Sequence, residues 1–302
     1  MYDCAIIGGG PAGLNAALVL GRARRTVVLF DDRQARNKVT HASHGFITRD
    51  GIEPGEFRRI ALDEIQRYPS VRFKEETATD IRRTEEGFEI RSAGGETIQA
   101  RKTILAAGLK EEFPEIPGLR DFYGRSLFNC PYCDGWELRD QPLVLLSEDE
   151  RAAHMAKILY NWSRDLIICT NGRRPLTEER IGKLASRGIR VIETPVTELY
   201  GQSGKLEQVR FADGSRIERT GGFVTPKWIP KASSFAEQLG CETTDLGAIR
   251  TDAMGKTGVP GLFAAGDAAY VGPSQLIYAA ASGSKAAMMV NADLTDEDFP
   301  DL

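Results

Sequence analysis

The feature that most constrains the fold is the glycine run Gly8-Gly9-Gly10-Pro11-Ala12-Gly13, which directly follows an apolar, strand-like run from Cys4 to Ile7. A helix-like apolar segment continues to Leu20, and a second strand-like run, Thr26 to Phe30, is followed by Asp31. Glycines spaced Gly-x-Gly-x-x-Gly between a strand and a helix are typical of a βαβ unit that binds a dinucleotide. We therefore predict a dinucleotide site at the start of the chain.

Each glycine of this motif has a physical role. Gly8 makes the tight turn, Gly10 lets the backbone approach a pyrophosphate, and Gly13 lets the helix pack on the strand. The helix N-terminus supplies a positive field for phosphate, and Asp31 can accept a hydrogen bond from a ribose hydroxyl. A glycine turn with only a structural role is the alternative, and the complete strand, helix and acidic context argues against it.

Composition excludes several other classes of protein. A hydrophobic fraction of 41% excludes a disordered or fibrous chain, and a net charge of −4 excludes a polycation that binds nucleic acid. No run approaches the roughly 18 uncharged residues that a bilayer crossing needs. The residues from Met1 to Cys4 lack the basic flank of a signal peptide. We expect a cytoplasmic protein with no nucleic-acid or membrane partner.

The order of the remaining elements indicates one domain inserted into another. We expect a helix over 56–68, strands over 88–91 and 103–108, a strand–helix–strand repeat over 143–146, 151–162 and 166–169, a hairpin over 206–217, and a helix over 274–291. The predicted fold class is α/β, with two dinucleotide-binding, Rossmann-like domains of three layers. Residues 1–115 and 246–302 form the first domain, and residues 116–245 form the inserted second domain.

Cys130 and Cys133 form the only C-x-x-C of the chain. At the start of a helix this spacing brings two sulfurs together, and the helix field favours the thiolate needed for thiol–disulfide exchange. Zinc binding and inert cysteines are the alternatives. A zinc site lacks ligands, because a second C-x-x-C is absent and the only histidines are His41, His44 and His154. A redox pair is favoured over a metal site. We interpret the remaining cysteines as isolated core or surface residues of a protein in a reducing compartment: Cys4, Cys169 and Cys241.

The run Thr257 to Asp267, which ends in Phe-Ala-Ala-Gly-Asp, resembles the second FAD motif of the flavoproteins with two dinucleotide-binding domains. This resemblance implies FAD as the cofactor, with Asp267 on its ribityl chain and Ala268 and Gln275 near the flavin. The expected cofactor-binding residues are Gly8, Gly10, Pro11, Ala12, Gly13, Asp31, Ala107, Gly108, Gly266, Asp267 and Gln275.

Together with both FAD motifs, the segment Cys130-Pro131-Tyr132-Cys133-Asp134-Gly135 resembles the redox centre of the low-molecular-weight thioredoxin reductases, over nearly the whole chain. The resemblance implies that Cys133 exchanges electrons with the flavin and Cys130 with an external disulfide or dithiol. It also implies that Asp134 is the acid–base group for the thiols, the alternative being a helix cap. A thioredoxin-like protein or a small dithiol is then the expected partner, and a homodimer the expected assembly.

The inserted domain departs from this family. The turn that should hold the NADPH pyrophosphate is Ser147-Glu148-Asp149-Glu150, which lacks both expected glycines and carries three consecutive acids. Where a basic cluster should hold the 2′-phosphate, the chain has Thr170-Asn171-Gly172, with Arg173 and Arg174 only after it. Thr225 to Trp228 also replaces the usual glycine-bearing turn. We expect an electron donor or acceptor other than NADPH.

The segment from His41 to Gly51 resembles one found in small-molecule dithiol oxidases related to these reductases. A histidine beside a thiol pair can accept a proton near neutral pH, so His44 is a candidate catalytic residue. A polar loop with no chemical role is the alternative. A second hypothesis places Phe299, in the acidic tail, over an exposed flavin face, either in its own chain or in a partner subunit.

The resulting expectation is an FAD-dependent thiol–disulfide oxidoreductase that works without NADPH. It would be either a dithiol oxidase or a disulfide reductase that receives electrons from a protein donor such as ferredoxin. One alternative is an ordinary NADPH-dependent thioredoxin reductase. Another, of a different class, is a flavin-binding redox sensor without turnover.

Overall fold

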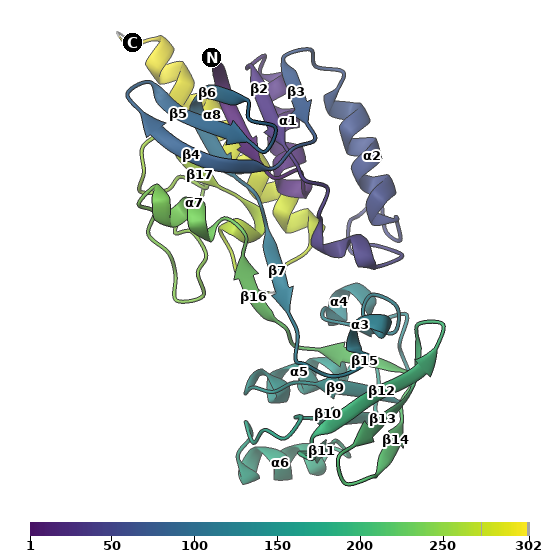
Figure 1. The fold of residues 1–302 in the computed structure, drawn as a ribbon. Helices are drawn as coiled ribbons and strands as arrows, with labels where there is room; N and C mark the ends of the chain where they lie inside the picture. Colours follow the sequence, from purple (N-terminus) through teal and green to yellow (C-terminus); the bar gives the residue numbers. More distant parts are fainter. Residues whose placement is uncertain (273, 301–302) are drawn as a thin grey trace. The chain divides into compact units, whose positions relative to one another are not determined.

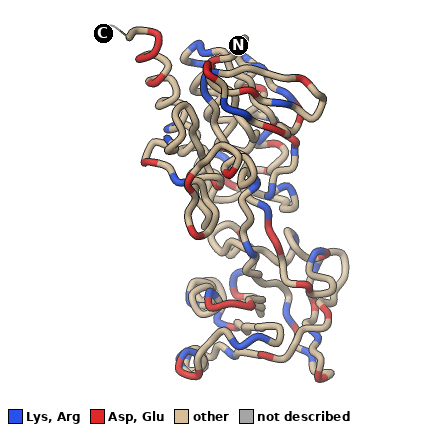
Figure 2. Tube along the Cα trace, turned by 60° about the vertical axis from the view of Figure 1, so that its left-hand side comes forward, with Lys and Arg blue, Asp and Glu red and all other residues tan. Residues whose placement is uncertain are grey.

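The computed structural model describes residues 1–272 and 274–300. The chain folds into two compact units (Figure 1). Unit 1 comprises residues 1–38, 46–110 and 228–302, and unit 2 comprises residues 39–45 and 111–227. Lys and Arg are interspersed with Asp and Glu along both units (Figure 2).

Unit 1 is built on one large sheet. Its strand order is β3 (Val71–Lys74), β2 (Val27–Phe30), β1 (Tyr2–Ile7), β6 (Thr97–Leu105), β5 (Gly87–Ser92) and β4 (Ala78–Thr84), with β17 (Leu262–Ala264) also paired to β6. The pairs β3–β2, β2–β1, β1–β6 and β6–β17 are parallel, whereas β6, β5 and β4 form an antiparallel meander. The helices of this unit are α1 (Pro11–Arg22), α2 (Pro54–Ile65), α7 (Ser233–Gln238) and α8 (Leu276–Asp298), with short 3₁₀ turns at Arg36–Val39 and Gly266–Ala268.

Alternating side chains of β1 divide the core of unit 1 into two layers. Cys4 and Ile6 point into a cluster with α1 and α8, which lie side by side in Figure 1, while Ala5 and Ile7 point into a cluster on the other face. The period-2 alternation of a strand produces this division. Because both faces are covered, the parallel strands are buried and their carboxyl ends meet at one edge.

Unit 2 has a parallel sheet of five strands, in the order β11 (Arg190–Ile192), β10 (Leu166–Cys169), β9 (Leu143–Leu146), β15 (Gly221–Val224) and β8 (Leu127–Phe128). Helices α5 (Arg151–Leu159) and α6 (Glu178–Ala185) pack on one face. The antiparallel sheet of β12 (Val196–Gln202), β13 (Lys205–Phe211) and β14 (Arg216–Glu218) packs on the other. Short helices α3 (Leu119–Phe122) and α4 (Pro131–Asp134) complete the unit, and β7 (Leu109–Glu112) pairs with β16 (Lys227–Pro230) where the chain passes between units.

The α/β class with two Rossmann-type domains is confirmed. The unit limits differ from those expected, because residues 228–245 join unit 1, where Ala232 and Ala236 are fully buried in its core. Helix α8 is longer than predicted and continues to Asp298. Among the described residues, no helix is both long enough and apolar enough to span a bilayer.

Candidate active site

The glycine turn after β1 is shaped by both packing and open space. Gly8 has φ +111°, and a Cβ there would lie 2.3 Å from the carbonyl oxygen of Ala106. A Cβ on Gly13 would lie 1.8 Å from the Gly8 carbonyl oxygen, so these two positions exclude any side chain. A Cβ on Gly10 would meet nothing within 4 Å. Protein packing therefore explains Gly8 and Gly13, whereas Gly10 leaves room for a ligand.

Helix α1 begins at this open space without a side-chain cap. Gly10 is its N-cap residue, and Pro11, which has no N–H, occupies the first helical position. The uncapped N–H groups of the first turn and the helix dipole together favour an anion such as a pyrophosphate. Ala107 and Gly108 follow the neighbouring strand β6, and Gly108 also faces open space.

Asp31 follows β2 at the same edge of the sheet and is buried. It forms an ion pair with Arg58 of α2, in which Asp31 Oδ2 meets Nη2 of Arg58, and its Oδ1 accepts a hydrogen bond from the backbone N–H of Arg33. Nε of Arg58 is buried without a hydrogen-bond partner. A carboxylate oxygen has two lone pairs, so Asp31 can still accept a hydrogen bond from a ribose hydroxyl. Sequence analysis missed Arg58, because no local motif marks it.

Asp267 lies in the 3₁₀ turn after β17 and is held from two sides. Its Oδ1 accepts a hydrogen bond from the Ser274 hydroxyl, and its Oδ2 lies 3.2 Å from Nη2 of Arg36. The Arg36 guanidinium in turn stacks over the Trp228 ring at 5.0 Å. Gln275 is the N-cap residue of α8. Arg36 and Trp228 are further residues beside this site that sequence analysis did not identify.

The residues expected to bind the cofactor therefore converge within unit 1. Glycines 8, 10 and 13, Asp31, residues 107–108 and the turn at Asp267 all lie at or just beyond strand ends of one sheet. The open space at Gly10 and the buried carboxylate of Asp31 after β2 fit a dinucleotide with a ribose and a pyrophosphate.

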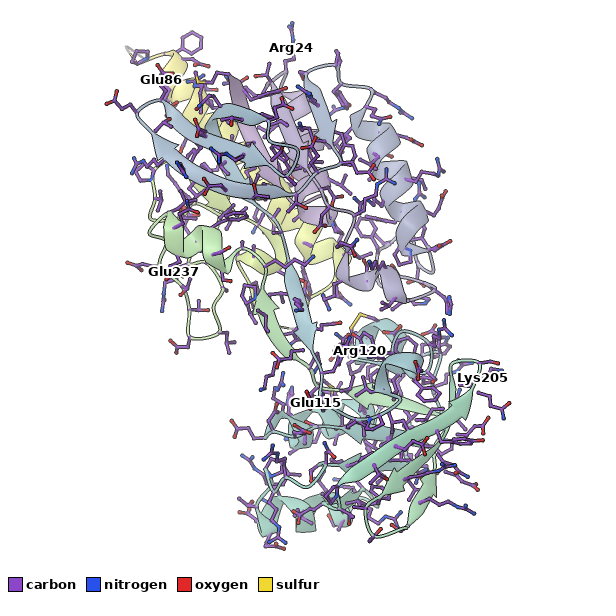
Figure 3. The ribbon with its side chains drawn as sticks, in the orientation of Figure 1. Arg24, Glu86, Glu115, Arg120, Lys205 and Glu237 are labelled. Atoms are coloured by element: carbon purple, nitrogen blue, oxygen red, sulfur yellow. A yellow bond between two sulfur atoms is a disulfide. The ribbon has the colours of Figure 1, made fainter. Side chains whose placement is uncertain are left out.

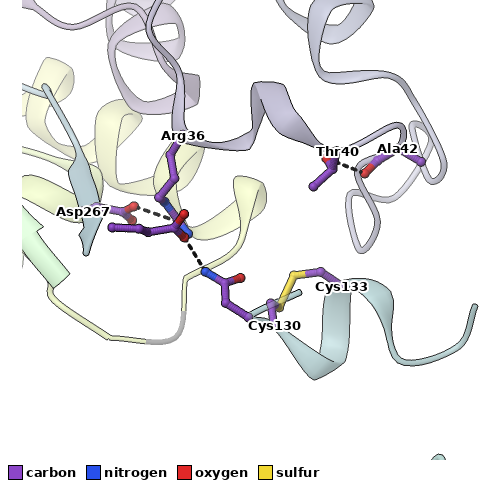
Figure 4. Close-up of a disulfide and its surroundings, with 8 residues drawn as sticks. Arg36, Thr40, Ala42, Cys130, Cys133 and Asp267 are labelled. Atoms are coloured by element: carbon purple, nitrogen blue, oxygen red, sulfur yellow. Dashed lines mark hydrogen bonds and ion pairs between the residues drawn. A yellow bond between two sulfur atoms is a disulfide. The ribbon is translucent and has the colours of Figure 1, made fainter. Parts of the chain in front are cut away.

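The C-x-x-C pair lies in unit 2. Cys130 is the N-cap residue of α4 and forms a disulfide with Cys133, with Cα atoms 5.3 Å apart (Figures 3 and 4). Asn129, just before the pair, donates a hydrogen bond to Glu111, which also accepts one from the Tyr123 hydroxyl. These contacts fix the backbone that leads into the disulfide.

The other cysteines are free thiols. Cys4 and Cys169 are fully buried in β1 and β10, and burial raises the pKa of each thiol, to about 12 for Cys169. Cys241 is half-buried, and burial raises its pKa as well. Because the thiolate is the reactive form, these three thiols are inert packing residues.

Asp134 ends α4, directly after Cys133. Burial, together with the negative charge of Glu137, raises the pKa of this carboxyl from 3.8 to about 7. A group that titrates near neutral pH can both donate and accept a proton under working conditions. The N-cap position of α4 belongs to Cys130, so Asp134 does not occupy the cap position that we considered as the alternative.

His44 lies on the loop 39–45, which belongs to unit 2. Thr40 donates a hydrogen bond to the Ala42 carbonyl oxygen and so orders this loop (Figure 4). Nε2 of His44 lies 3.6 Å from Oε1 of Glu137, and His41 is exposed. The structure thus brings His44 to the turn after α4 through Glu137, an acid that sequence analysis did not single out.

The turn between β9 and α5 is closed by its own side chains. The Ser147 hydroxyl and the Thr225 hydroxyl are hydrogen-bonded at 2.7 Å, and both residues are buried. Nδ2 of Asn171 donates to Oε1 of Glu148 at 2.6 Å, while its Oδ1 accepts from the backbone N–H of Val196. The two side chains that replace expected family features, Ser147 and Asn171, therefore join three strand ends of unit 2.

Acidic side chains of this turn are also fixed. Arg151 forms a fork with the Asp149 carboxylate and donates to the Pro226 carbonyl oxygen. Burial alone would raise the pKa of Asp149, but the hydrogen bonds from Arg151 lower it below its usual value. Arg174 is highly exposed and pairs with Glu193, and Arg173 is exposed.

Comparison with known proteins identifies relatives over the full chain. The family model described as pyridine nucleotide-disulphide oxidoreductase matches residues 2–283. Thioredoxin reductase aclD of Aspergillus oryzae is 32% identical, over 88% of this chain and 88% of the relative. The crystal structure of a candidate thioredoxin reductase, TrxB, from Bacillus anthracis has a TM-score of 0.95 and 49% identity, covering 99% of this chain and 100% of that one. The crystal structure of HlmI has a TM-score of 0.94 and 37% identity, covering 99% and 94%.

Proposed function

The chain belongs to the pyridine nucleotide-disulphide oxidoreductase family, among its thioredoxin reductase-like enzymes, and from this premise we propose that it is a thiol–disulfide oxidoreductase that works without NADPH. FAD is the cofactor of this family and supplies a two-electron donor and acceptor. In our proposal, Cys130 exchanges electrons with an external dithiol or disulfide, and Cys133 exchanges them with the flavin. Asp134 and His44 move the protons that thiol exchange requires.

The observation that carries NADPH independence is the closed turn between β9 and α5. A pyrophosphate at the start of α5 would have to break the hydrogen bond between Ser147 and Thr225 or that between Glu148 and Asn171. It would also approach the carboxylates of Glu148 and Glu150, whereas the Asp149 carboxylate is already paired with Arg151. At a separation of about 6 Å and an effective dielectric of about 20, one such repulsion costs roughly 3 kcal/mol. A helix N-terminus contributes only about 0.3–1 kcal/mol, so repulsion exceeds attraction.

The arginines after β10 do not offset this loss. Nε of Arg174 lies 3.2 Å from a Glu193 carboxylate oxygen, and its side chain is 85% exposed, so it is already paired at the surface. A 2′-phosphate is normally held by arginines in fixed bidentate geometry. Such a fixed arginine is absent from the turn 170–172.

We favour a dithiol oxidase or a disulfide reductase fed by a protein donor such as ferredoxin. The direction of electron flow decides between them. The partner is a thioredoxin-like protein or a small dithiol, the assembly a homodimer, and the location cytoplasmic, where buried free thiols such as Cys4 and Cys169 persist in reduced form. An ordinary NADPH-dependent thioredoxin reductase is the alternative within the family, and a flavin-binding redox sensor without turnover is the alternative of another class.

Anaerobic mixing tests the proposal. Purified holoprotein is mixed separately with NADPH, reduced ferredoxin and dithiothreitol, and bleaching of the flavin is followed by absorbance. We expect no bleaching by NADPH within the time of turnover and rapid bleaching by the dithiol or by ferredoxin. Rapid bleaching that saturates at micromolar NADPH would instead assign the chain to the ordinary reductases. Absence of bleaching with every donor would leave only the flavin-binding redox sensor as an explanation.

A further inference from the structure

The guanidinium of Arg58 is buried beside the glycine turn with one donor unsatisfied. The Arg58 side chain, which comes from α2, is 16% exposed, and the side chain of its partner Asp31 is 7% exposed. Nη2 of Arg58 meets Oδ2 of Asp31, whereas Nε of Arg58 is buried and has no hydrogen-bond partner among the described residues. A polar N–H group that is withdrawn from water and left unpaired is costly. An acceptor on a bound ligand would remove this cost.

The carboxylate of Asp31 links this guanidinium to the glycine turn. A Cβ on Gly9 would collide with the Asp31 carboxylate, so this carboxylate lies directly against the turn after β1. Oδ1 of Asp31 accepts a hydrogen bond from the backbone N–H of Arg33, and the Asp31 N–H donates to the Lys74 carbonyl oxygen at the end of β3. Arg58 is therefore one side chain away from the place where we expect the ribose and the pyrophosphate.

Glu75, which directly follows β3, also acts on Arg58. Burial, the larger effect, lowers the pKa of Arg58, and the negative charge of Glu75 opposes this change. Glu75 itself pairs with Arg33, and both of these side chains are more than half exposed. An arginine side chain stays protonated in proteins, so Nε of Arg58 keeps its hydrogen and acts as a donor. The partner that it lacks is an acceptor.

Arg59, the next residue along α2, has the opposite environment. Its side chain is 60% exposed, and its guanidinium pairs with Glu56 and Asp63 of the same helix. Adjacent positions of a helix do not face each other, so Arg58 and Arg59 point in different directions. The two arginines form a matched pair for experiment, one buried against Asp31 and one paired at the surface.

We propose that Arg58 is an FAD-binding residue, which holds the Asp31 carboxylate for the ribose of the adenosine part and donates its Nε–H to that same part of the cofactor. The ribose oxygens, the pyrophosphate oxygens and the ring nitrogens of adenine are acceptors of the required chemistry. The positive charge of Arg58 also compensates the charge of Asp31, which alone would repel the pyrophosphate. This inference rests on FAD as the cofactor of the family, and it is independent of whether NADPH binds.

The test is the affinity of the full chain for FAD. Holoprotein is diluted in steps, free FAD is separated by ultrafiltration, and its fluorescence gives the dissociation constant. Arg58→Leu keeps an apolar stem and removes the guanidinium. Arg58→Lys keeps a positive charge beside Asp31 and removes the Nε donor. Arg59→Leu is the matched control.

We expect Arg58→Leu to raise the dissociation constant for FAD about 100-fold, because a charge-assisted contact and the compensation of Asp31 are both lost. Arg58→Lys should raise it about tenfold, because the charge of Asp31 stays compensated and one donor to FAD is lost. Arg59→Leu should bind FAD as wild type does.

Melting temperatures with and without FAD distinguish binding from a purely structural role. A ligand that binds the folded state raises the melting temperature, and weaker binding reduces that rise. We therefore expect a smaller FAD-dependent rise in Arg58→Leu than in wild type. A lower melting temperature with an undiminished rise would overturn the proposal, because that result indicates loss of structure alone.

An Arg58→Leu variant whose dissociation constant for FAD equals that of wild type would also overturn the proposal. Should this variant fail to fold, Arg58→Lys decides: weaker binding of FAD supports the assignment, and wild-type binding refutes it. Bleaching of the wild-type flavin by NADPH would defeat the proposed function and leave this test intact, because the affinity for FAD is measured without turnover.

Discussion

The carboxyl of Asp134 is half-buried beside the Cys130–Cys133 disulfide, and we expect it to affect stability measurably. Its pKa rises from 3.8 to about 7 on folding. Between these values the folded state holds a proton that the unfolded state releases, so stability falls as the pH rises and the loss is complete above pH 7. From pH 5 to pH 8 this amounts to about 3 kcal/mol.

Asp134→Asn removes this dependence. The free energy of unfolding of the variant, relative to wild type, should increase by about 3 kcal/mol between pH 5 and pH 8, as measured by urea denaturation at each pH. Turnover should fall by about 10²–10⁴, the usual contribution of a general acid–base. A variant that keeps its rate and melts earlier at every pH would leave only a structural role for Asp134.

Substitution of Cys130 and substitution of Cys133 should produce different defects in turnover. Cys130→Ser should abolish exchange with external substrate while FAD remains bound, because in the proposed function the Cys130 sulfur is the one that reacts with the substrate. Cys133→Ser should instead break electron transfer between thiol and flavin. Single-turnover kinetics with dithiothreitol distinguishes the two defects. Equal residual turnover in both variants, above a few per cent of wild type, would contradict the division of roles.

Single residues also mark the limit of sequence reasoning. The roles of Gly8 and Gly13 follow from local spacing, because both act on the turn in which they lie. Arg58 and Arg36 could not be found in that way: Arg36 contacts Asp267, 231 positions away, and Arg58 on helix α2 contacts Asp31, which follows strand β2. Glu137 had a weak signal, its spacing from Asp134, but its contact with His44 depends on how loop 39–45 folds.

At the scale of elements, the C-terminal end of α8 extends further than its polar sequence suggested. Asp298 pairs with Arg25 and Arg101, and Glu297 pairs with Lys102 and Arg101. These bases lie on or beside β2 and β6, whose partner strand β1 begins at this end, whereas Gly8 follows the other end of β1. Within one chain, Phe299 thus lies at the opposite end of the sheet from the glycine turn. Figure 2 shows the acidic residues of this helix end.

Truncation at Asp293 should therefore affect stability and not the flavin. It removes the ion pairs of Glu297 and Asp298, so that buried Lys102 loses its partner, together with the contact of fully buried Leu294. We expect a melting temperature lower by several degrees, measured by calorimetry, and an unchanged flavin spectrum and reoxidation rate. A changed spectrum or rate would revive the hypothesis that Phe299 covers the flavin, with the residue supplied by a partner subunit.

A second prediction at this scale concerns the turn between β9 and α5. Replacing Ser147 and Asp149 by glycine should not restore NADPH binding, because Glu148 and Glu150 still repel phosphate and a fixed arginine for the 2′-phosphate is still missing. Isothermal titration calorimetry of this double variant with NADPH should give no heat of binding at millimolar nucleotide. Micromolar affinity would mean that the glycines alone decide nucleotide binding.

For the whole molecule, the α/β class could be predicted from the sequence, because local patterns of apolar residues and glycines show the order of strands and helices along the chain. The sequence contains two strand–helix–strand repeats, and near Gly261 it again has an apolar strand followed by a glycine turn, as at the start of the chain. This order indicated an inserted domain. The limits of the units could not be predicted in the same way. Residues 39–45 join a unit that is remote in sequence, through contacts such as that of His44 with Glu137. Residues 228–245 join unit 1 because side chains such as Ala236 are buried in its core.

The surface of α8 leads to a prediction about assembly. Its exposed residues recur at alternating spacings of three and four, at Tyr278, Ala281, Lys285, Met288 and Ala292, so they form one stripe. Tyr278 is 66% and Met288 50% exposed, and the stripe borders a pocket of about 210 Å³ lined by Met254 and Tyr278. Two large exposed apolar side chains on one face of a helix, Tyr278 and Met288, are typical of protein interfaces, and we expect a second copy of the chain to cover them.

The double variant Tyr278→Glu, Met288→Glu should then be monomeric. Burial of large apolar side chains contributes about 1.5–3 kcal/mol each, and an unpaired charge in their place costs still more, so the association constant should fall by several powers of ten. Light scattering after size exclusion measures the mass directly. Ile47→Glu, a change at an apolar side chain that is 80% exposed on another segment, is the matched control and should remain dimeric. A wild type that is monomeric at tens of micromolar, or a double variant that stays dimeric, would exclude this face of α8 as the interface.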